Sequence, residues 1–439
     1  MHFSVRKTYL CTMKRKWFSL SPLLLFLALY LVTSLIAGDF YKVPISVAFL
    51  VSAVYAIAVS TGSLADRIET FSKGAGSSQM MLMLWIFILA GAFAGSARAM
   101  GAVDATVNLT LSALPASLLL PSVFLASCFI SLAIGTSCGT IAALTPVAVG
   151  IAQQTGTGLP LMCAIVVGGA FFGDNLSFIS DTTIIATQTQ GCRMSDKFRT
   201  NFRLVLPVAL TVLLVYYFIG QDIAAPGKIP PVEWWKVIPY LAVIILAIIG
   251  MEVTLVLLLG LILTGAVGIA DGSYDVWGWM ASMSSGMLGM SELIIVTLLA
   301  AGMLAIIKAN GGIDYIIYIL TRRISSARGA ELAIAGLVAL IDICTANNTV
   351  TLITTGPIAH NISRKFNLVP RRVASILDTA SCSLQGLLPY GAQVLIAAGL
   401  AADVFGQPVS PTAIIRYLYY PLGLGIVVIL SILLHKNRQ

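Results

Sequence analysis

GDNLSFISDTT, residues 173–183, sets two aspartates among hydroxyl and amide side chains inside an otherwise apolar segment. The segment runs from residue 160 to residue 185, and about 20 apolar residues are enough to span a bilayer. An ionisable group at membrane depth costs at least about 2.5 to 3.5 kcal/mol on insertion scales, and it indicates a functional site by default. Unwound backbone is tolerated at that depth only where it lines a cavity or is buried in protein. This stretch therefore predicts a membrane protein with broken helices around a polar cavity.

The composition of the whole chain agrees with a membrane protein. Of its 439 residues 58% are apolar and only 10% are charged, whereas soluble domains are about 25% charged. The formal net charge of +8 comes from 26 Lys and Arg residues, which form short clusters between apolar runs. Such clusters fit membrane topology better than a nucleic-acid surface. We therefore expect a lipid bilayer as a partner and no nucleic acid.

The cysteines and histidines give no sign of a cofactor. Seven Cys and three His residues show no C-x-x-C or H-x-x-x-H spacing, which argues against a zinc site, an attached haem or a disulfide framework. An intramembrane enzyme would need a nucleophile beside a base, and the chain has no H-E-x-x-H motif and no His within a polar break. We therefore expect no cofactor and no enzymatic activity.

Apolar segments recur along the chain and predict an all-α integral membrane protein, with a single membrane transport domain over residues 1–439. The candidate segments are 17–37, 43–61, 80–98, 119–134, 139–152, 160–185, 203–220, 237–250, 254–270, 292–308, 330–345, 346–361, 373–400 and 417–434. Several are short or interrupted by Gly, Pro, Asn or Asp, so we expect about 10 to 14 transmembrane or half-membrane helices.

The distribution of basic residues predicts the orientation. If every segment crosses and the N-terminus is cytoplasmic, 21 Lys and Arg residues, Lys197 among them, fall on the inner side and five on the outer side. We therefore expect an inner (cytoplasmic) membrane protein with both termini in the cytoplasm. The first apolar run, 17–37, is longer than a signal peptide needs, so we expect an uncleaved first helix. Met13 is an equally plausible start of the chain.

A shift of 211 residues aligns the two halves of the chain without a gap. Identical pairs are Gly91 and Gly302, Gly101 and Gly312, Thr140 and Thr351, Pro146 and Pro357, and Ala148 and Ala359. Corresponding segments are seven passes apart and run in opposite directions, which predicts two inverted-topology repeats with cores at 80–200 and 291–401. In transporters of this architecture the substrate site lies near the midplane, where broken helices of the two repeats meet.

Each half contains two polar breaks with a proline between them. The breaks are GTSCGT at 135–140, GDNLSFISDTT at 173–183, DICTANNTVT at 342–351 and DTASCSLQGLLPYGAQ at 378–393. Under the shift, Asp174 falls on Gln385, and Asp342 falls on Ser131. We expect these breaks to meet and form the site.

Four aspartates lie within or beside apolar runs: Asp174, Asp181, Asp342 and Asp378. Seven residues separate Asp174 from Asp181, so both project from one face if the segment stays helical. Carboxylate, hydroxyl and amide oxygens are ligands of hard cations, and a desolvated carboxylate also holds a proton readily. One carboxylate that binds either a cation or a proton is sufficient for cation/proton exchange. The alternative is that these aspartates cap half-helices or pair with basic residues.

The second half supplies candidate ligands for a polar substrate. Asn347, Asn348 and Thr349 interrupt an apolar stretch, and a buried amide without a partner is costly. The remaining candidates are Thr136, Ser137, Asp378 and Gln385. The structural alternative is that these groups hydrogen-bond neighbouring helices, as polar residues commonly do in membrane bundles. Acidic residues near predicted helix ends, such as Glu331, are expected at the membrane interface.

At these residues the chain resembles the NhaC-type sodium/proton antiporter family. The motifs that carry the resemblance are FGDNLSFISDTT at 172–183, GTSCGT at 135–140 and TANNT at 345–349. The resemblance implies an inner-membrane secondary transporter of the wider ion-transporter superfamily, built from inverted repeats, with sodium ions and protons as transported species. It also implies that the cation path is lined by Asp174, Asn175, Ser177, Ser180, Asp181 and Thr182.

Two departures from the family pattern keep a second function open. Phe178 stands where the family commonly has Pro, and LLPYGAQ at 387–393 replaces the common LxPW pattern. Relatives of the family also move amino acids or carboxylates coupled to sodium or protons. The alternative function is therefore sodium- or proton-coupled transport of a small organic solute, held by Asn347, Asn348 and Gln385. A channel is less favoured, because paired carboxylates and repeat inversion favour a carrier; a homodimer is left open.

Overall fold

The fold is helical throughout the part of the chain that the computed structural model describes. That part consists of residues 16–37, 45–177, 180–221, 223, 230–249, 251–321, 324–406 and 409–434. Every regular element within these ranges is a helix, so the predicted all-α class is confirmed. Met13 and Phe178 lie outside the described residues.

The described helices divide between the two halves of the sequence. In the first half they are η1 (Lys16–Leu20), α2 (Ser21–Ala37), α3 (Ile45–Val59), α4 (Leu64–Ala75), α5 (Ser78–Met100), α6 (Ala102–Ala113), η2 (Ala116–Leu118), α7 (Leu119–Ile134), α8 (Ser137–Thr155), α9 (Leu159–Leu176), α10 (Asp181–Gln190) and α11 (Met194–Gly220). In the second half they are α12 (Trp234–Ile248), α13 (Val253–Asp271), α14 (Val276–Gly289), α15 (Ser291–Ala309), α16 (Gly312–Thr321), α17 (Ala327–Thr345), α18 (Asn348–Lys365), α19 (Pro370–Gly386), α20 (Ala392–Phe405), α21 (Pro411–Ile415) and α22 (Tyr419–Leu434).

The described helices include several that are suited to crossing a membrane. The stretches that are long and apolar enough are Met80–Met100, Leu159–Gln190, Met194–Gly220, Thr254–Asp271 and Val276–Ala309. The pair Ala102–Ala113 and Ala116–Leu132, bent by 112°, is a further candidate. The chain is therefore a multi-pass membrane protein, and its number of complete crossings stays a prediction.

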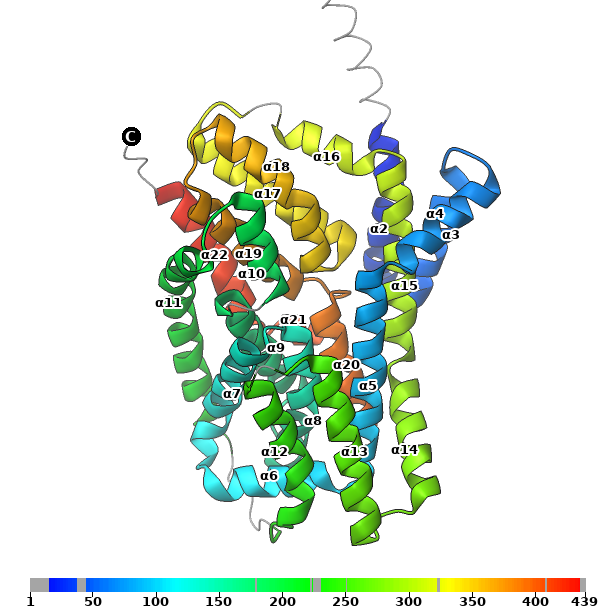
Figure 1. Cartoon of the computed structure of the whole chain (residues 1–439), viewed down its shortest axis with the longest axis vertical. Helices are drawn as coiled ribbons and strands as arrows, with labels where there is room; N and C mark the ends of the chain where they lie inside the picture. Colours follow the sequence, from blue (N-terminus) through cyan, green and yellow to red (C-terminus); the bar gives the residue numbers. More distant parts are fainter. Residues whose placement is uncertain are drawn as a thin grey trace, which may run out of the picture.

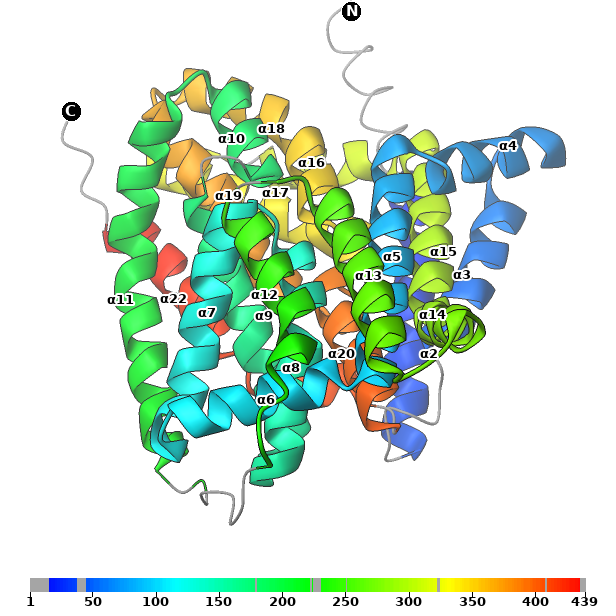
Figure 2. The same cartoon turned by 60° about the horizontal axis from the view of Figure 1, so that its bottom comes forward.

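Helices α6 and α16 lie across opposite ends of the bundle. In Figure 1, α6 runs across the lower end, nearly perpendicular to α5 and α13, whereas α16 lies obliquely at the upper end. The turned view in Figure 2 shows the same crossing of α6 over the long helices. Both helices lie outside the predicted apolar segments, because α6 carries polar residues such as Asp104 and Asn108 and α16 is only 10 residues long.

Helix α4 projects at the upper end of the molecule beside α15 (Figure 1). None of its residues is buried. It begins with a capping box, in which the Ser63 hydroxyl accepts from the Asp66 backbone amide and the Asp66 carboxylate accepts from the Ser63 amide. The Asp66 carboxylate also accepts from the Ser63 hydroxyl, and this bond, together with the one from the Ser63 amide, holds the pKa of Asp66 below its ordinary value. Hydrogen bonds of the capping box, and not burial, therefore determine where this exposed helix begins.

Helix starts repeat at the 211-residue shift that aligns the sequence. Helix α9 begins at Leu159 and α19 begins at Pro370, 211 positions later. Helix α10 begins at Asp181 and α20 begins at Ala392, which is again 211 positions later. Equivalent positions therefore begin equivalent helices in the two halves.

Left-handed backbone recurs at the same shift. Gly135 (φ 74°) ends α7, and its counterpart Ala346 (φ 50°) ends α17. Gly156 and Asn367, also 211 positions apart, have φ values of 69° and 50°. Such conformations are uncommon for residues other than glycine, so their recurrence supports the predicted repeat. The inversion of the two repeats stays a prediction.

Contacts between the halves are reciprocal. Helix α10 packs against α18, and α20, the counterpart of α10, packs against α8, the counterpart of α18. In both views α10 lies in the upper part of the molecule and α20 in the lower part (Figures 1 and 2). In each half, a short helix follows the second polar break. This helix packs against the helix that follows the first polar break of the other half.

Candidate functional site

Asp174 is buried near the C-terminal end of α9, where it is 3% exposed. Gly173 determines this depth, because a Cβ atom there would lie 2.5 Å from the Cys128 carbonyl oxygen and the Leu132 amide nitrogen of α7. Only glycine allows the two helices to approach this closely, as small residues do at membrane helix interfaces. Helix α9 ends at Leu176, shortly after Asp174.

Hydroxyl groups hold the Asp174 carboxylate. Ser137 Oγ donates to Asp174 Oδ2 at 3.0 Å, and Ser180 Oγ donates to Oδ1. Ser180 also shares a hydrogen bond of 2.9 Å with Thr182 Oγ1. Among the described side chains, no basic group forms an ion pair with Asp174. The carboxylate is thus oriented by neutral donors that a cation or a proton can supplement.

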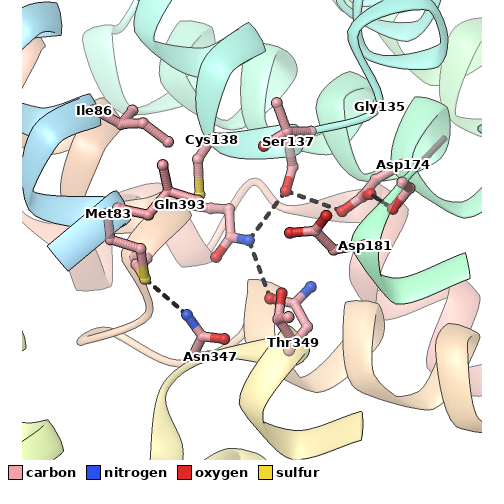
Figure 3. A pocket seen from close by; sticks show the side chains of 15 residues that line it. Met83, Ile86, Gly135, Ser137, Cys138, Asp174, Asp181, Asn347, Thr349 and Gln393 are labelled. Atoms are coloured by element: carbon pink, nitrogen blue, oxygen red, sulfur yellow. Dashed lines mark hydrogen bonds between the residues drawn. The ribbon is translucent and has the colours of Figure 1, made fainter. Parts of the chain in front are cut away.

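A cavity of about 70 Å³ adjoins Asp174 (Figure 3). Its polar lining comes from both halves of the chain and consists of Thr136, Ser137, Asp174, Ser180, Asp181, Asn347, Asn348, Thr349 and Gln393. Apolar side chains of α5, including Met83 and Ile86, line it as well. All four polar breaks contribute residues to this lining, and the fourth contributes Ala392 and Gln393. The breaks therefore meet at this cavity.

Some predicted site residues lie outside the cavity lining. They are Asn175, Ser177, Thr182, Asp378 and Gln385. The Asn175 amide donates to the Phe171 carbonyl at 2.9 Å and to the Tyr420 hydroxyl at 3.1 Å. Asn175 therefore links α9 to α22 by hydrogen bonds, which is a structural role and not that of an ion ligand in the cavity.

Asp174 and Asp181 do not share one helical face. The helix is interrupted between Leu176 and Asp181, and Ser180 is the N-cap of α10. Asp181 is the first residue of α10 and is exposed, although it also lines the cavity. The condition under which both aspartates would project from one helical face is therefore not met, because the break separates a buried acid from an exposed one.

Asn347 and Asn348 have different roles at the break between α17 and α18. Asn347 is the N-cap of α18, and its Oδ1 accepts from the Val350 amide at 3.0 Å. Its side-chain amide also contacts Met83 Sδ at 2.7 Å. Asn348 Oδ1 accepts from Gln393 Nε2 at 3.2 Å. Asn347 thus caps α18, while Asn348 belongs to the hydrogen-bond network of the cavity.

Gln393 is a site residue that was not predicted. Its Nε2 donates to Ser137 Oγ at 3.1 Å (Figure 3), and it also donates to Asn348. Its Oε1 accepts from Gln385 Nε2 at 3.2 Å, so the predicted Gln385 reaches the cavity through Gln393. Gln393 closes the polar break at 378–393 and falls on Thr182 under the 211-residue shift, and that equivalence is the signal that could have identified it.

Lys197 and Asp378 form an ion pair inside the protein. Lys197 Nζ lies 2.7 Å from Asp378 Oδ2, and the two side chains are 1% and 0% exposed. Lys197, which was counted among the basic residues of the inner side, is buried because its ammonium group contacts the end of α9 and the first turn of α10. Asp378 matches the alternative of pairing with a basic residue.

Glu331 is buried inside the protein. It is 2% exposed, and its two oxygens accept from Arg372 Nε at 2.6 Å and from another guanidinium nitrogen at 2.9 Å. Arg372, at the start of α19, compensates the charge of Glu331 inside the protein, and the position of Glu331 at the membrane interface stays a prediction.

Residues 135–139 match the G-x-S-x-G spacing of a hydrolase nucleophile elbow. In that motif the serine lies between a strand and a helix and is served by a histidine base. Here Ser137 is the first residue of α8, after another helix, and its hydroxyl donates to Asp174. No histidine is among the described residues that line the cavity. The match therefore gives no support to a hydrolase.

A multi-pass helical protein whose paired helix breaks enclose a buried carboxylate belongs to the class of membrane transporters. The sequence profile described as the Na+/H+ antiporter family matches residues 5–221 and 231–434. The chain therefore belongs to the Na+/H+ antiporter family, and the NhaC-type resemblance is confirmed.

Three curated relatives are similar over most of their length. The chain is 22% identical to the malate-2H+/Na+-lactate antiporter of Bacillus subtilis (strain 168) over 357 residues, 74% of this chain and 76% of the relative. It is 25% identical to the Na+/H+ antiporter NhaC of Alkalihalophilus pseudofirmus over 335 residues, 66% and 71% of the two chains. It is 23% identical to the Na+/H+ antiporter NhaC of Bacillus subtilis over 397 residues, 82% and 84% of the two chains.

Proposed function

We propose that the protein exchanges sodium ions for protons across the cytoplasmic membrane by alternating access. The observation that carries this proposal is the environment of Asp174, a buried carboxylate at a polar cavity that is hydrogen-bonded by Ser137 and Ser180. A carboxylate so placed binds a sodium ion or a proton, but not both, because either one neutralises the same charge. Exclusive occupancy couples the two fluxes.

Ligands for a sodium ion are available around the Asp174 carboxylate. The hydroxyls of Ser137 and Ser180 and the carboxylate of Asp181 face the same cavity, and oxygen atoms of these kinds bind hard cations. Asp181, being exposed, is suited to attract a cation toward the buried Asp174. Gln393 orients Ser137 and thereby connects the ligand set with the second half of the chain.

The size of the cavity favours an ion as the cargo. Its volume of about 70 Å³ accommodates a cation with a few water molecules. Sites for organic ligands usually measure about 300 to 1,000 Å³. The conformation described here therefore suits sodium better than an organic acid.

The proposed mechanism includes two inverted repeats with both termini in the cytoplasm. Support comes from helix starts and left-handed residues that recur at 211 positions and from the reciprocal packing of α10 with α18 and α20 with α8. The positions of α6 and α16 at opposite ends of the bundle agree with inversion (Figure 1). In such folds one repeat moves against the other around a fixed site.

A second candidate function is sodium- or proton-coupled transport of an organic solute. It is favoured by the similarity to the malate-2H+/Na+-lactate antiporter of Bacillus subtilis. The amides of Asn348 and Gln393, which face the cavity, are groups that would hydrogen-bond a carboxylate or an amino acid. This function needs a larger cavity in another state of the transport cycle.

Proteoliposomes that contain a pH-sensitive dye separate the two functions. A sodium pulse without organic solute should drive proton flux, and Asp174→Asn should abolish it, because an amide cannot alternate between a cation and a proton. Glu252→Gln, which removes an exposed carboxylate at the N-cap of α13, is the control and should retain the flux. Flux that requires malate, lactate or an amino acid would instead establish the second function.

A further inference from the structure

The Lys197 ammonium group is enclosed by three oxygen atoms. They are Asp378 Oδ2 at 2.7 Å, Thr183 Oγ1 at 2.6 Å and the carbonyl oxygen of Asn175 at 3.0 Å. An ammonium group has three donors, so each of them is used. None of these four residues lines the cavity beside Asp174, and the cluster is therefore a separate feature.

The three oxygens are the kinds of ligand that a monovalent cation binds when it loses water: a carboxylate, a hydroxyl and a backbone carbonyl. The carbonyl of Asn175 lies in the last turn of α9, where backbone oxygens have no helical partner and the helix dipole is negative. Half-helix C-terminal ends coordinate sodium ions in other secondary transporters. The cluster thus has the composition of a cation site.

The oxygens are held in place without the lysine. Asn201, one turn after Lys197 on α11, donates from Nδ2 to the Asn175 carbonyl at 2.9 Å and to Asp378 Oδ2 at 2.8 Å. Asn201 is fully buried, at 0% exposure. A second donor therefore keeps the carbonyl and the carboxylate together, which a simple ion pair would not require.

We propose that the three oxygens form a second monovalent-cation site that the Lys197 ammonium group occupies as a tethered cation. This inference rests on the proposed function only for the identity of the competing ion, sodium. While Lys197 is in place, the protein binds at most one sodium ion per chain, at Asp174. The tethered cation also joins the end of α9 to the start of α10, and it thereby fixes the break that positions Ser180 against Asp174.

Sodium binding to purified Lys197→Ala protein tests the inference. This variant leaves the three oxygens and Asn201 in place and vacates the volume of the ammonium group, so equilibrium binding of radioactive sodium should rise by one ion per chain. Sodium chloride should also raise its thermal unfolding temperature more than choline chloride of equal ionic strength does. The double variant Lys197→Ala/Asp378→Asn lacks the carboxylate and should lose both effects.

Lys236→Ala is a matched control, because Lys236 is also paired with carboxylates, those of Glu233 and Asp271, but is partly exposed to solvent. It should gain no sodium binding. Unchanged binding in folded Lys197→Ala protein, or two sodium ions bound per wild-type chain, would overturn the inference. The wild-type count of two would overturn it even where the variant does not fold. Failure of the proposed function has a different signature, namely no sodium-driven proton flux in the wild type.

Discussion

Gln393 donates a hydrogen bond to Ser137 at 3.1 Å, and Ser137 donates in turn to Asp174 at 3.0 Å. Ser137 begins α8 in the first half of the chain, and Gln393 lies in the first turn of α20 in the second half. Because the serine oxygen accepts from the amide, its single proton is directed at the carboxylate. The environment of Asp174 therefore depends on a residue that lies 256 positions after Ser137 in the chain.

Gln393→Ala should weaken sodium binding without preventing exchange. The variant removes the hydrogen bond that orients Ser137, and such a bond is worth about 1 to 1.5 kcal/mol. The sodium concentration for half-maximal exchange should therefore rise about 5- to 15-fold, with a smaller change in maximal rate. Sodium-driven proton flux in proteoliposomes measures both quantities.

Gln190→Ala is the control for this variant. Gln190 is also a buried amide that donates a hydrogen bond, to the Gly356 carbonyl at 2.9 Å, but it does not line the cavity. Its removal should lower stability and leave the half-maximal sodium concentration unchanged. A similar rise in both variants would contradict a specific role of Gln393.

Asp181→Asn should be much milder than Asp174→Asn. Asp181 is exposed, and surface charges contribute about 0 to 1 kcal/mol, so the half-maximal sodium concentration should rise less than about tenfold. Asp174→Asn should eliminate exchange, because the buried carboxylate is the group that alternates. Equal loss in both variants, measured at matched protein density in vesicles, would show that the two aspartates act as one unit.

Ala346→Gly should stabilise the protein. Ala346 has φ 50°, and left-handed backbone costs a non-glycine residue about 1 to 2 kcal/mol. The greater freedom of glycine in the unfolded chain offsets about 0.4 to 1 kcal/mol of that gain. We expect a net increase of up to about 1.6 kcal/mol in the free energy of unfolding, measured by denaturation in detergent.

Ala333→Gly, on the same helix, is the control and should lower the free energy of unfolding. Ala333 lies inside α17 with ordinary helical neighbours, where glycine costs about 1 kcal/mol. Destabilisation by Ala346→Gly of a similar size would mean that the left-handed conformation at the break is absent in the membrane protein.

Arg372→Ala should strongly destabilise the protein. It leaves Glu331 buried and without its guanidinium partner, and breaking a buried ion pair costs about 3 to 5 kcal/mol. The double variant Arg372→Met/Glu331→Leu removes both charges and should recover most of the loss. Thermal unfolding in detergent measures the series, and a double variant as unstable as Arg372→Ala would contradict the explanation.

The sequence predicted the helical membrane class, the polar breaks and the equivalence of the two halves, because each of these follows from local composition. Asp174 and Asn348 were identified by the same reasoning, since a polar group in an apolar run is costly unless it has partners. Asp181 also lines the cavity, but its exposure follows from the unwinding that precedes α10. Apolar periodicity alone does not locate the residue at which a helix ends.

The sequence alone did not predict which polar side chains contact one another. Lys197 has the same local sequence character as the basic residues around it, yet it is buried against Asp378 because α11 packs beside α9 and α19. Gln393 is one amide among several until the fold places it between Ser137 and Asn348.

The amino-acid order by itself determined where the chain enters apolar surroundings and where it must unwind, because burial of charge and freed backbone are penalised wherever they occur. Only the tertiary structure decided that hydroxyl groups hydrogen-bond Asp174, whereas Lys197 forms an ion pair with Asp378. That choice depends on distances of a few ångströms between segments far apart in the chain, and electrostatic and hydrogen-bond energies change steeply over such distances.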